Sequence, residues 1–116
     1  MLNSNLGLKS NEIEKIQMVF ANHAEIEKVI VYGSRAKGNH RPYSDIDLSL
    51  VGNIDLTLQN KIELELDDLL LPYKFDVSIF YKIENKELIE HINRIGKTIY
   101  LPGNSAAAHS RFKPFP

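Results

Sequence analysis

Apolar positions along the chain follow two different periods, and this difference predicts strands that alternate with helices. Runs of branched and aromatic residues predict strands at 29–32, 45–50 and 75–80, with a short edge strand at 97–101. In the second of these strands, Ile46, Leu48 and Leu50 are expected to face the core. The polar residues between them would then lie on the opposite face of the sheet.

Three segments carry apolar residues at helical spacing and predict helices at 11–23, 55–70 and 84–95. In the first helix, Asn11 is expected to be the N-cap, with Glu14 three residues further on as in a capping box. The charged side chains of Glu12, Glu14 and Lys15 are expected to form a solvated face. Gly96 is expected to end the third helix.

Apolar residues of the second predicted helix fall into two groups. Those expected to form the core stripe are Leu58, Ile62, Leu66 and Leu69. Leu56 and Leu64 fall outside this stripe, where extra apolar residues can mark a face that binds a partner. Scattered exposed leucines are also common on helices, so both interpretations stay open.

The joint between the first two long strands limits how these strands can pair. It is too short for the helical crossover that a parallel pair requires, so the two strands are expected to run antiparallel. The alternation of strands and helices gives an α/β fold, with a mixed β-sheet flanked by helices.

The Gly33-Ser34 pair ends the first strand and has the chemistry of half a phosphate cradle. Gly33 has no side chain, so a phosphate could approach the backbone there, and Ser34 adds a hydroxyl beside the N–H groups of a helix start. No His or Lys is placed by the sequence to activate Ser34, which disfavours a covalent nucleophile.

Three aspartates on two predicted strands form a candidate metal site. Asp45 and Asp47 are two residues apart, which places both carboxylates on one face of their strand, and Asp76 occupies the polar face of the third strand. A surface strand would tolerate the paired charges, whereas a cleft would require cations. Carboxylate oxygens favour Mg²⁺ or Mn²⁺, and three such groups could hold two ions roughly 3.5 to 4 Å apart.

Basic residues lie between the glycine turn and the aspartates. Arg35, Lys37 and Arg41 could each contact phosphate, although a solvated loop charge is an equally good interpretation of any one of them. His40 is expected to be an exposed loop residue and not a base.

Composition narrows the function classes further. The net charge of −1 on 116 residues provides no general attraction to nucleic acid or to anionic lipid, so neither partner is expected. The chain has no cysteine and its four histidines are far apart in sequence, which argues against a zinc site. No apolar run approaches the ~20 residues that a membrane span needs, and a cytoplasmic location is expected.

The end of the chain differs in composition from the rest. Residues 104–116 have neither helical nor strand periodicity, and they are expected to be a mobile natural tail or residues left by cloning. The expected domain is therefore 1–103.

Together these features resemble a known signature. Gly33-Ser34, ten intervening residues, Asp45-x-Asp47 and then Asp76 on a later strand are similar to the motif of the polymerase-β-like nucleotidyltransferase superfamily. The short chain resembles the minimal nucleotidyltransferases, the MntA-type antitoxins that pair with HEPN toxins in toxin–antitoxin systems. This resemblance implies the polymerase-β-like nucleotidyltransferase fold.

The resemblance also implies a reaction. A Mg-dependent nucleotidyltransferase would move a nucleoside monophosphate, expected to be AMP from ATP although another NTP stays open, onto a hydroxyl of a separately encoded helical protein, such as a tyrosine of a HEPN toxin. Asp45, Asp47 and Asp76 would be catalytic and would hold two Mg²⁺ ions, or Mn²⁺ in their place. The nucleotide-binding residues would be Gly33, Ser34, Arg35 and Arg41.

Two alternatives remain at this stage. In one, the chain is the nucleotidyltransferase subunit of an enzyme that acts on a small molecule, with a separate helical subunit binding the substrate. In the other, it is a non-catalytic module that neutralises a toxin by binding it through the face that carries Leu56 and Leu64.

Overall fold

The computed structural model describes residues 6–103 as four strands and four α-helices in alternation, with one short 3-10 helix. In chain order these elements are α1 (Ser10–Ala21), β1 (Ile26–Tyr32), α2 (Ser34–Lys37), β2 (Ile46–Gly52), α3 (Leu56–Asp67), β3 (Phe75–Ile79), η1 (Phe80–Lys82), α4 (Lys86–Ile95) and β4 (Lys97–Tyr100). The predicted alternation of strands and helices is confirmed.

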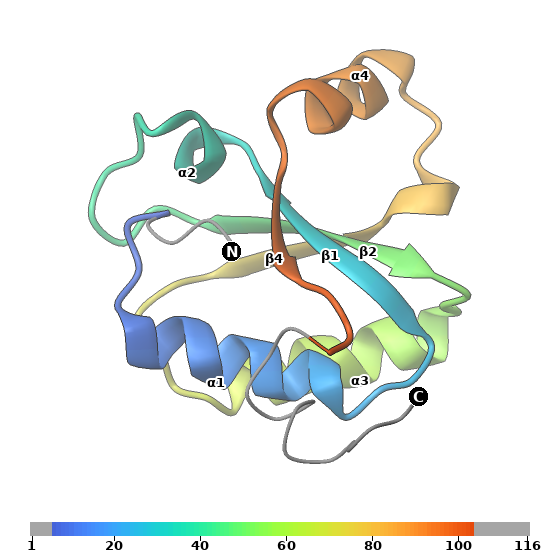
Figure 1. Ribbon diagram of the computed structural model, residues 1–116, viewed down its shortest axis with the longest axis horizontal. Helices are drawn as coiled ribbons and strands as arrows, with labels where there is room; N and C mark the ends of the chain where they lie inside the picture. The colour runs from blue at the N-terminus through green and yellow to red at the C-terminus, as the bar shows by residue number, and fades with distance from the viewer. Residues whose placement is uncertain (1–5, 104–116) are drawn as a thin grey trace.

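The four strands form one mixed sheet in the order β3-β2-β1-β4 (Figure 1). β1 runs antiparallel to both of its neighbours, while β2 and β3 are parallel and are connected through α3. The expected antiparallel pairing of the first two long strands is therefore confirmed, and β4 is the edge strand that was expected.

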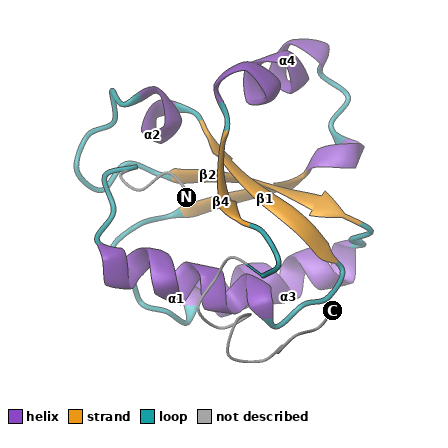
Figure 2. Cartoon of the chain, viewed as in Figure 1, coloured by secondary structure: helices purple, strands orange, loops and turns teal. Residues whose placement is uncertain are grey.

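Helices cover the two faces of the sheet unequally (Figure 2). α1 and α3 pack side by side under one face, whereas α4 lies over the other. The α4 face has only a small apolar cluster, in which Ile30, Val51 and Ile92 are the buried members. The thinner cover leaves part of this face to polar residues.

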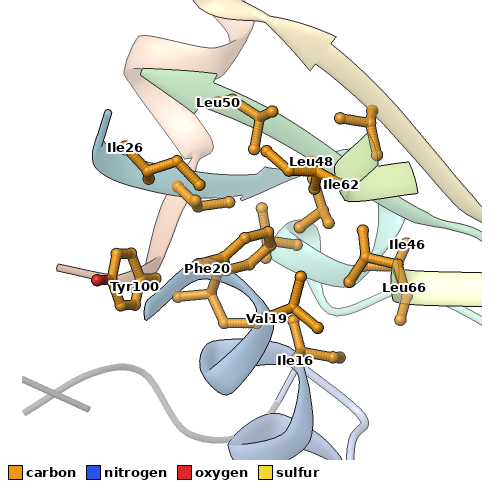
Figure 3. Packing of buried hydrophobic residues seen from close by; sticks show 14 of the residues in the cluster. Ile16, Val19, Phe20, Ile26, Ile46, Leu48, Leu50, Ile62, Leu66 and Tyr100 are labelled. Atoms are coloured by element: carbon orange, nitrogen blue, oxygen red, sulfur yellow. The ribbon is translucent and has the colours of Figure 1, made fainter. Parts of the chain in front are cut away.

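The main core lies between the sheet and the α1–α3 layer (Figure 3). Ile46, Leu48 and Leu50 of β2 are fully buried there, as the alternation in the sequence predicted. Phe20 of α1 and Ile62 of α3 are also fully buried and belong to the same cluster as the strand residues. Removing large apolar side chains from water in this way is the main stabilising contribution to the fold.

Helix α3 has the two kinds of leucine that the sequence distinguished. Ile62 and Leu66 are buried, and Leu58 and Leu69 pack against the same core. Leu56 and Leu64 are 62% and 65% exposed, as their place outside the stripe indicated.

Helix α1 differs from the prediction at its start. It begins at Ser10, with Lys9 as the N-cap, so Asn11 is inside the helix and Glu12 occupies the capping-box position expected for Glu14. The predicted solvated face is wrong at Glu12, which is buried and accepts hydrogen bonds from the Lys9 amide and the Tyr73 hydroxyl. Tyr73 is far away in sequence, so helical periodicity alone could not reveal this partner.

No helix within residues 6–103 is both long and apolar enough to cross a membrane. The predictions for the tail, 104–116, concern residues outside the described part of the chain.

Candidate active site

The glycine turn after β1 has a backbone conformation that only glycine adopts readily. Gly33 has φ +76° and ψ −152°, and a Cβ atom at this position would collide with Oδ2 of Asp47. Ser34 then begins the four-residue helix α2, which ends at Gly38 with φ +87°. Gly33 is therefore required by the close approach of an aspartate, in addition to any space a phosphate would need.

Pairing of the strands brings two of the predicted aspartates together. Asp47 on β2 is the register partner of Asp76 on β3 and also of Tyr32 on β1, so the three form one row across the sheet. Asp45 is exposed and immediately precedes β2, which begins at Ile46. The expectation that Asp76 lies beside the Asp45-x-Asp47 segment agrees with this arrangement.

Electrostatics link the three carboxylates. Burial raises the pKa of Asp47, and the negative charges of Asp76 and then Asp45 raise it further. None of the three has an ion-pair partner among residues 6–103, where the one ion pair joins His23 to Glu65. The charges of this cluster are therefore left without neutralisation by the described protein groups.

The carboxylate oxygens suit a hard divalent cation, but they do not by themselves complete its coordination shell. Within the described residues, no three acidic or histidine side chains already converge as a metal site. Mg²⁺ usually takes one or two protein carboxylates and completes its shell with waters and substrate phosphates. Asp47 and Asp76, with Asp45 beside them, fit that mode of binding.

Tyr32 and Ser78 belong to this face of the sheet and were missed by the sequence analysis, whereas Ser49 lies on it as the alternation along β2 predicted. Burial raises the pKa of Tyr32, a hydrogen bond with Ser78 opposes that rise, and the charges of Asp47 and Asp76 add to it. One row deeper, Ser78 donates a hydrogen bond to the hydroxyl of its register partner Ser49 at 3.3 Å. The alternation of Tyr32 with the core residue Val31 is the signal in the sequence that could have placed it on the aspartate face.

The predicted basic residues separate into two groups. Arg41 and Lys37 are exposed, and no hydrogen bond or ion pair of either side chain is seen within residues 6–103. Arg35 is 2% exposed, and its guanidinium donates to backbone carbonyls instead of facing the aspartates. His40 is half-buried against Gly7, unlike the exposed loop residue that was expected, and its Nδ1 has no partner.

Comparison with protein families finds one match. The family model described as polymerase beta, nucleotidyltransferase matches residues 14–103, which include the glycine turn and all three aspartates. A comparison with curated proteins finds no match.

Solved structures with a similar fold come from toxin–antitoxin complexes. A chain of a toxin–antitoxin crystal structure with AMP-PNP is 19% identical, with a TM-score of 0.63 over 78% of this chain and 73% of that one. A chain of the MntA–HepT toxin–antitoxin structure is 14% identical, with a TM-score of 0.61 over 80% and 73%. A chain of the tri-AMPylated Shewanella oneidensis HEPN toxin in complex with MNT antitoxin is 15% identical, with a TM-score of 0.61 over 81% and 73%. At these identities the likeness shows a shared fold.

Proposed function

The chain belongs to the polymerase β nucleotidyltransferase family, and we propose that it transfers AMP from ATP to a hydroxyl group of a partner protein. The observation that carries this proposal is the row in which Asp47 pairs with Asp76 beside the Gly33 turn. These residues occupy the positions at which the sequence resembles the family motif. Enzymes of this family are nucleotidyltransferases.

Each residue of the site has a proposed role. Asp45, Asp47 and Asp76 would hold Mg²⁺, which when bound stabilises charge on the triphosphate and lowers the pKa of the acceptor hydroxyl. Gly33 and Ser34 would lie against the phosphates, and Arg41, whose side chain is exposed, would contact them from the loop. The protein then contributes positioning and charge more than covalent chemistry.

The reaction would proceed by direct displacement at the α-phosphorus. The acceptor oxygen forms a bond to this phosphorus while the bond to the bridging oxygen of the β-phosphate breaks, and pyrophosphate leaves. Asp76 is exposed on the outer strand β3 of the sheet, where an acceptor from another molecule can approach it. Its carboxylate would receive the proton of the acceptor hydroxyl.

The proposed partner is a helical protein of the HEPN type. The similar structures include a tri-AMPylated HEPN toxin in complex with an MNT antitoxin, and another toxin–antitoxin pair with AMP-PNP. These descriptions support AMP as the transferred group and a toxin side chain, such as a tyrosine, as the acceptor.

The exposed leucines favour a second candidate function. Leu56 and Leu64 on α3 would let the chain bind and neutralise a toxin without catalysis. The Asp45→Asn/Asp47→Asn double variant distinguishes the two functions. If that variant still suppresses partner toxicity fully, binding and not catalysis is the mechanism.

The direct test of the catalytic proposal is transfer of a label. The protein is incubated with Mg²⁺, ATP labelled at the α-phosphate and a HEPN-type protein as the candidate acceptor. We expect label on that protein, and we expect Asp47→Asn to reduce the rate by more than the roughly 100-fold loss typical of groups that only support a metal ligand. Label on a small molecule but not on the protein would instead assign a small-molecule acceptor.

A further inference from the structure

Arg35 joins three segments of the chain through its guanidinium. Nε and Nη2 donate to the carbonyl oxygen of Ser44, at 3.2 and 2.9 Å. Nη1 donates to the carbonyl oxygens of Leu6 and Gly7, at 2.9 and 3.4 Å. These bonds tie the segment before α1 to the loop that enters β2, and the two run close together in Figure 1.

An aromatic ring and a carboxylate support this guanidinium. Its Cζ atom lies 4.8 Å from the centroid of the Tyr73 ring, within the range of a cation–π contact. The Tyr73 hydroxyl donates to Glu12 at 2.9 Å, and Glu12 brings a negative charge close to the buried cation. A buried arginine is expensive without such partners, so the surrounding groups hold it in one place.

The hydrogen bonds of Arg35 place it between the glycine turn and the aspartates of the candidate site. Arg35 follows Ser34 directly, and its main acceptor, the Ser44 carbonyl, belongs to the peptide bond that leads into Asp45. Ser44 is also held by Arg41, whose amide donates to the Ser44 hydroxyl at 2.8 Å. Arg35 therefore links the glycine turn to the residue that precedes Asp45, in addition to the pairing of β1 with β2.

We infer that Arg35 is a positioning residue for the cation site, which acts by holding Asp45 beside Asp47 and not by contacting phosphate. The inference rests on the proposed function for the role of the cation. The positioning role requires the planar fork of arginine, since three guanidinium nitrogens donate to three carbonyls on two separate segments of the chain. A lysine keeps the charge but cannot reproduce these bonds.

The test measures Mn²⁺ binding without nucleotide, by the loss of the free Mn²⁺ signal in electron paramagnetic resonance. Arg35→Lys should weaken the affinity about 10-fold, the lower end for losing hydrogen bonds to a charged group. Asp45→Asn should weaken it by a similar or larger factor. The double variant should bind within about 2-fold of Asp45→Asn alone, because Arg35 would act through Asp45.

Gln17→Ala provides a matched control for a loss of stability. Gln17 is buried, and its side-chain amide donates to the Ile99 carbonyl at 2.8 Å, on elements that do not carry the aspartates. This variant should unfold at a lower temperature and bind Mn²⁺ as the parent does. Parent-like Mn²⁺ affinity in Arg35→Lys, or additive losses in the double variant, would overturn the inference.

If Arg35→Lys does not fold, Tyr73→Leu provides a smaller perturbation of the Arg35 guanidinium. It removes the ring beneath the guanidinium and should weaken Mn²⁺ binding about 2- to 5-fold, the value of an exposed to partly buried cation–π contact. Unchanged affinity in this variant would then overturn the inference.

The experiment also separates this inference from the proposed function. A parent that binds Mn²⁺ but transfers no AMP refutes the proposed reaction, while the comparison of Arg35 and Asp45 variants still decides the positioning role. If the parent protein binds no Mn²⁺, there is no cation site for Arg35 to position, and the inference is overturned as well.

Discussion

The negative charge of Asp47 is unfavourable in the folded chain. Burial raises its pKa, and the charges of Asp76 and Asp45 raise it further. A carboxyl group with a raised pKa stabilises the fold in its protonated form, and this contribution is lost as the pH rises through the folded-state value. Without a bound cation, the ionised Asp47 therefore lowers the stability of the folded chain at neutral pH.

This cost predicts that Asp47→Asn stabilises the protein when divalent cations are absent. The unfolding midpoints of variant and parent should agree below about pH 3, where the carboxyl is protonated in both states, and diverge as the pH rises. Urea unfolding in EDTA from pH 3 to pH 7 measures the difference. Asp68→Asn, at the end of α3, controls for the change in net charge and should show no comparable divergence.

Two glycines with positive φ make it possible to distinguish an effect on the candidate site from an effect of backbone strain. Gly33→Ala and Gly38→Ala should each cost about 1 to 3 kcal/mol of stability, since both residues have φ values that other residues avoid. Only Gly33→Ala should also impair AMP transfer, because its Cβ would displace the Asp47 carboxylate while nothing lies within 4 Å of a Cβ at Gly38. Equal loss of activity in both variants would contradict this explanation.

Single residues were predicted well where the role depends on neighbours in sequence, and poorly where it depends on distant partners. The spacing of Asp45 and Asp47 is local, and the structure keeps them close enough to interact. From the sequence, Glu12 was expected to be a solvated charge and Arg35 to be a phosphate contact or a solvated charge, yet both are buried. Their burial depends on Tyr73, which follows α3 and is brought to them only by the complete fold.

At the level of elements, the apolar periods predicted the three longer helices and the four strands, but not the short helices α2 and η1, and they could not fix how the strands pair. The short joint favoured an antiparallel pair of β1 and β2, and this pairing is present. The register that places Asp47 opposite Asp76 depends on the parallel pairing of β2 with β3, the two strands that α3 connects. Helix ends were shifted because capping depends on local hydrogen bonds, as at Lys9.

Helix α3 offers a test of capping in which one helix supplies its own control. Asp55 is the N-cap and accepts a hydrogen bond from the Leu58 amide at 2.8 Å, so Asp55→Ala should cost ~1 kcal/mol. Asp67, in the last turn, is exposed and lies at the negative end of the helix dipole. Asp67→Ala should therefore be neutral or stabilising by up to about 1 kcal/mol. Chemical denaturation measures both, and equal destabilisation would refute the capping role.

For the whole molecule, the division of the sheet into two faces explains how one small domain can be both stable and chemically active. The α1–α3 face contains the main core, which is independent of the aspartates. The α4 face has the smaller cluster and carries the row of Tyr32, Asp47 and Asp76. Changes to the charges of that row should thus alter stability without dismantling the core.

Stability of the whole chain should depend on divalent cations, because cation binding would relieve the repulsion among Asp45, Asp47 and Asp76. A cation at 100 times its Kd adds ~2.7 kcal/mol to the unfolding free energy, and ATP should increase the effect of Mg²⁺. Thermal unfolding is measured with millimolar MgCl₂ and with NaCl at equal ionic strength, since salt alone screens exposed charges. We expect the Tm to rise more with MgCl₂ than with NaCl, and most of this difference to be lost in Asp76→Asn. A variant that kept the full Mg²⁺-specific rise would exclude Asp76 from the cation site and leave Asp45 and Asp47 as its protein ligands.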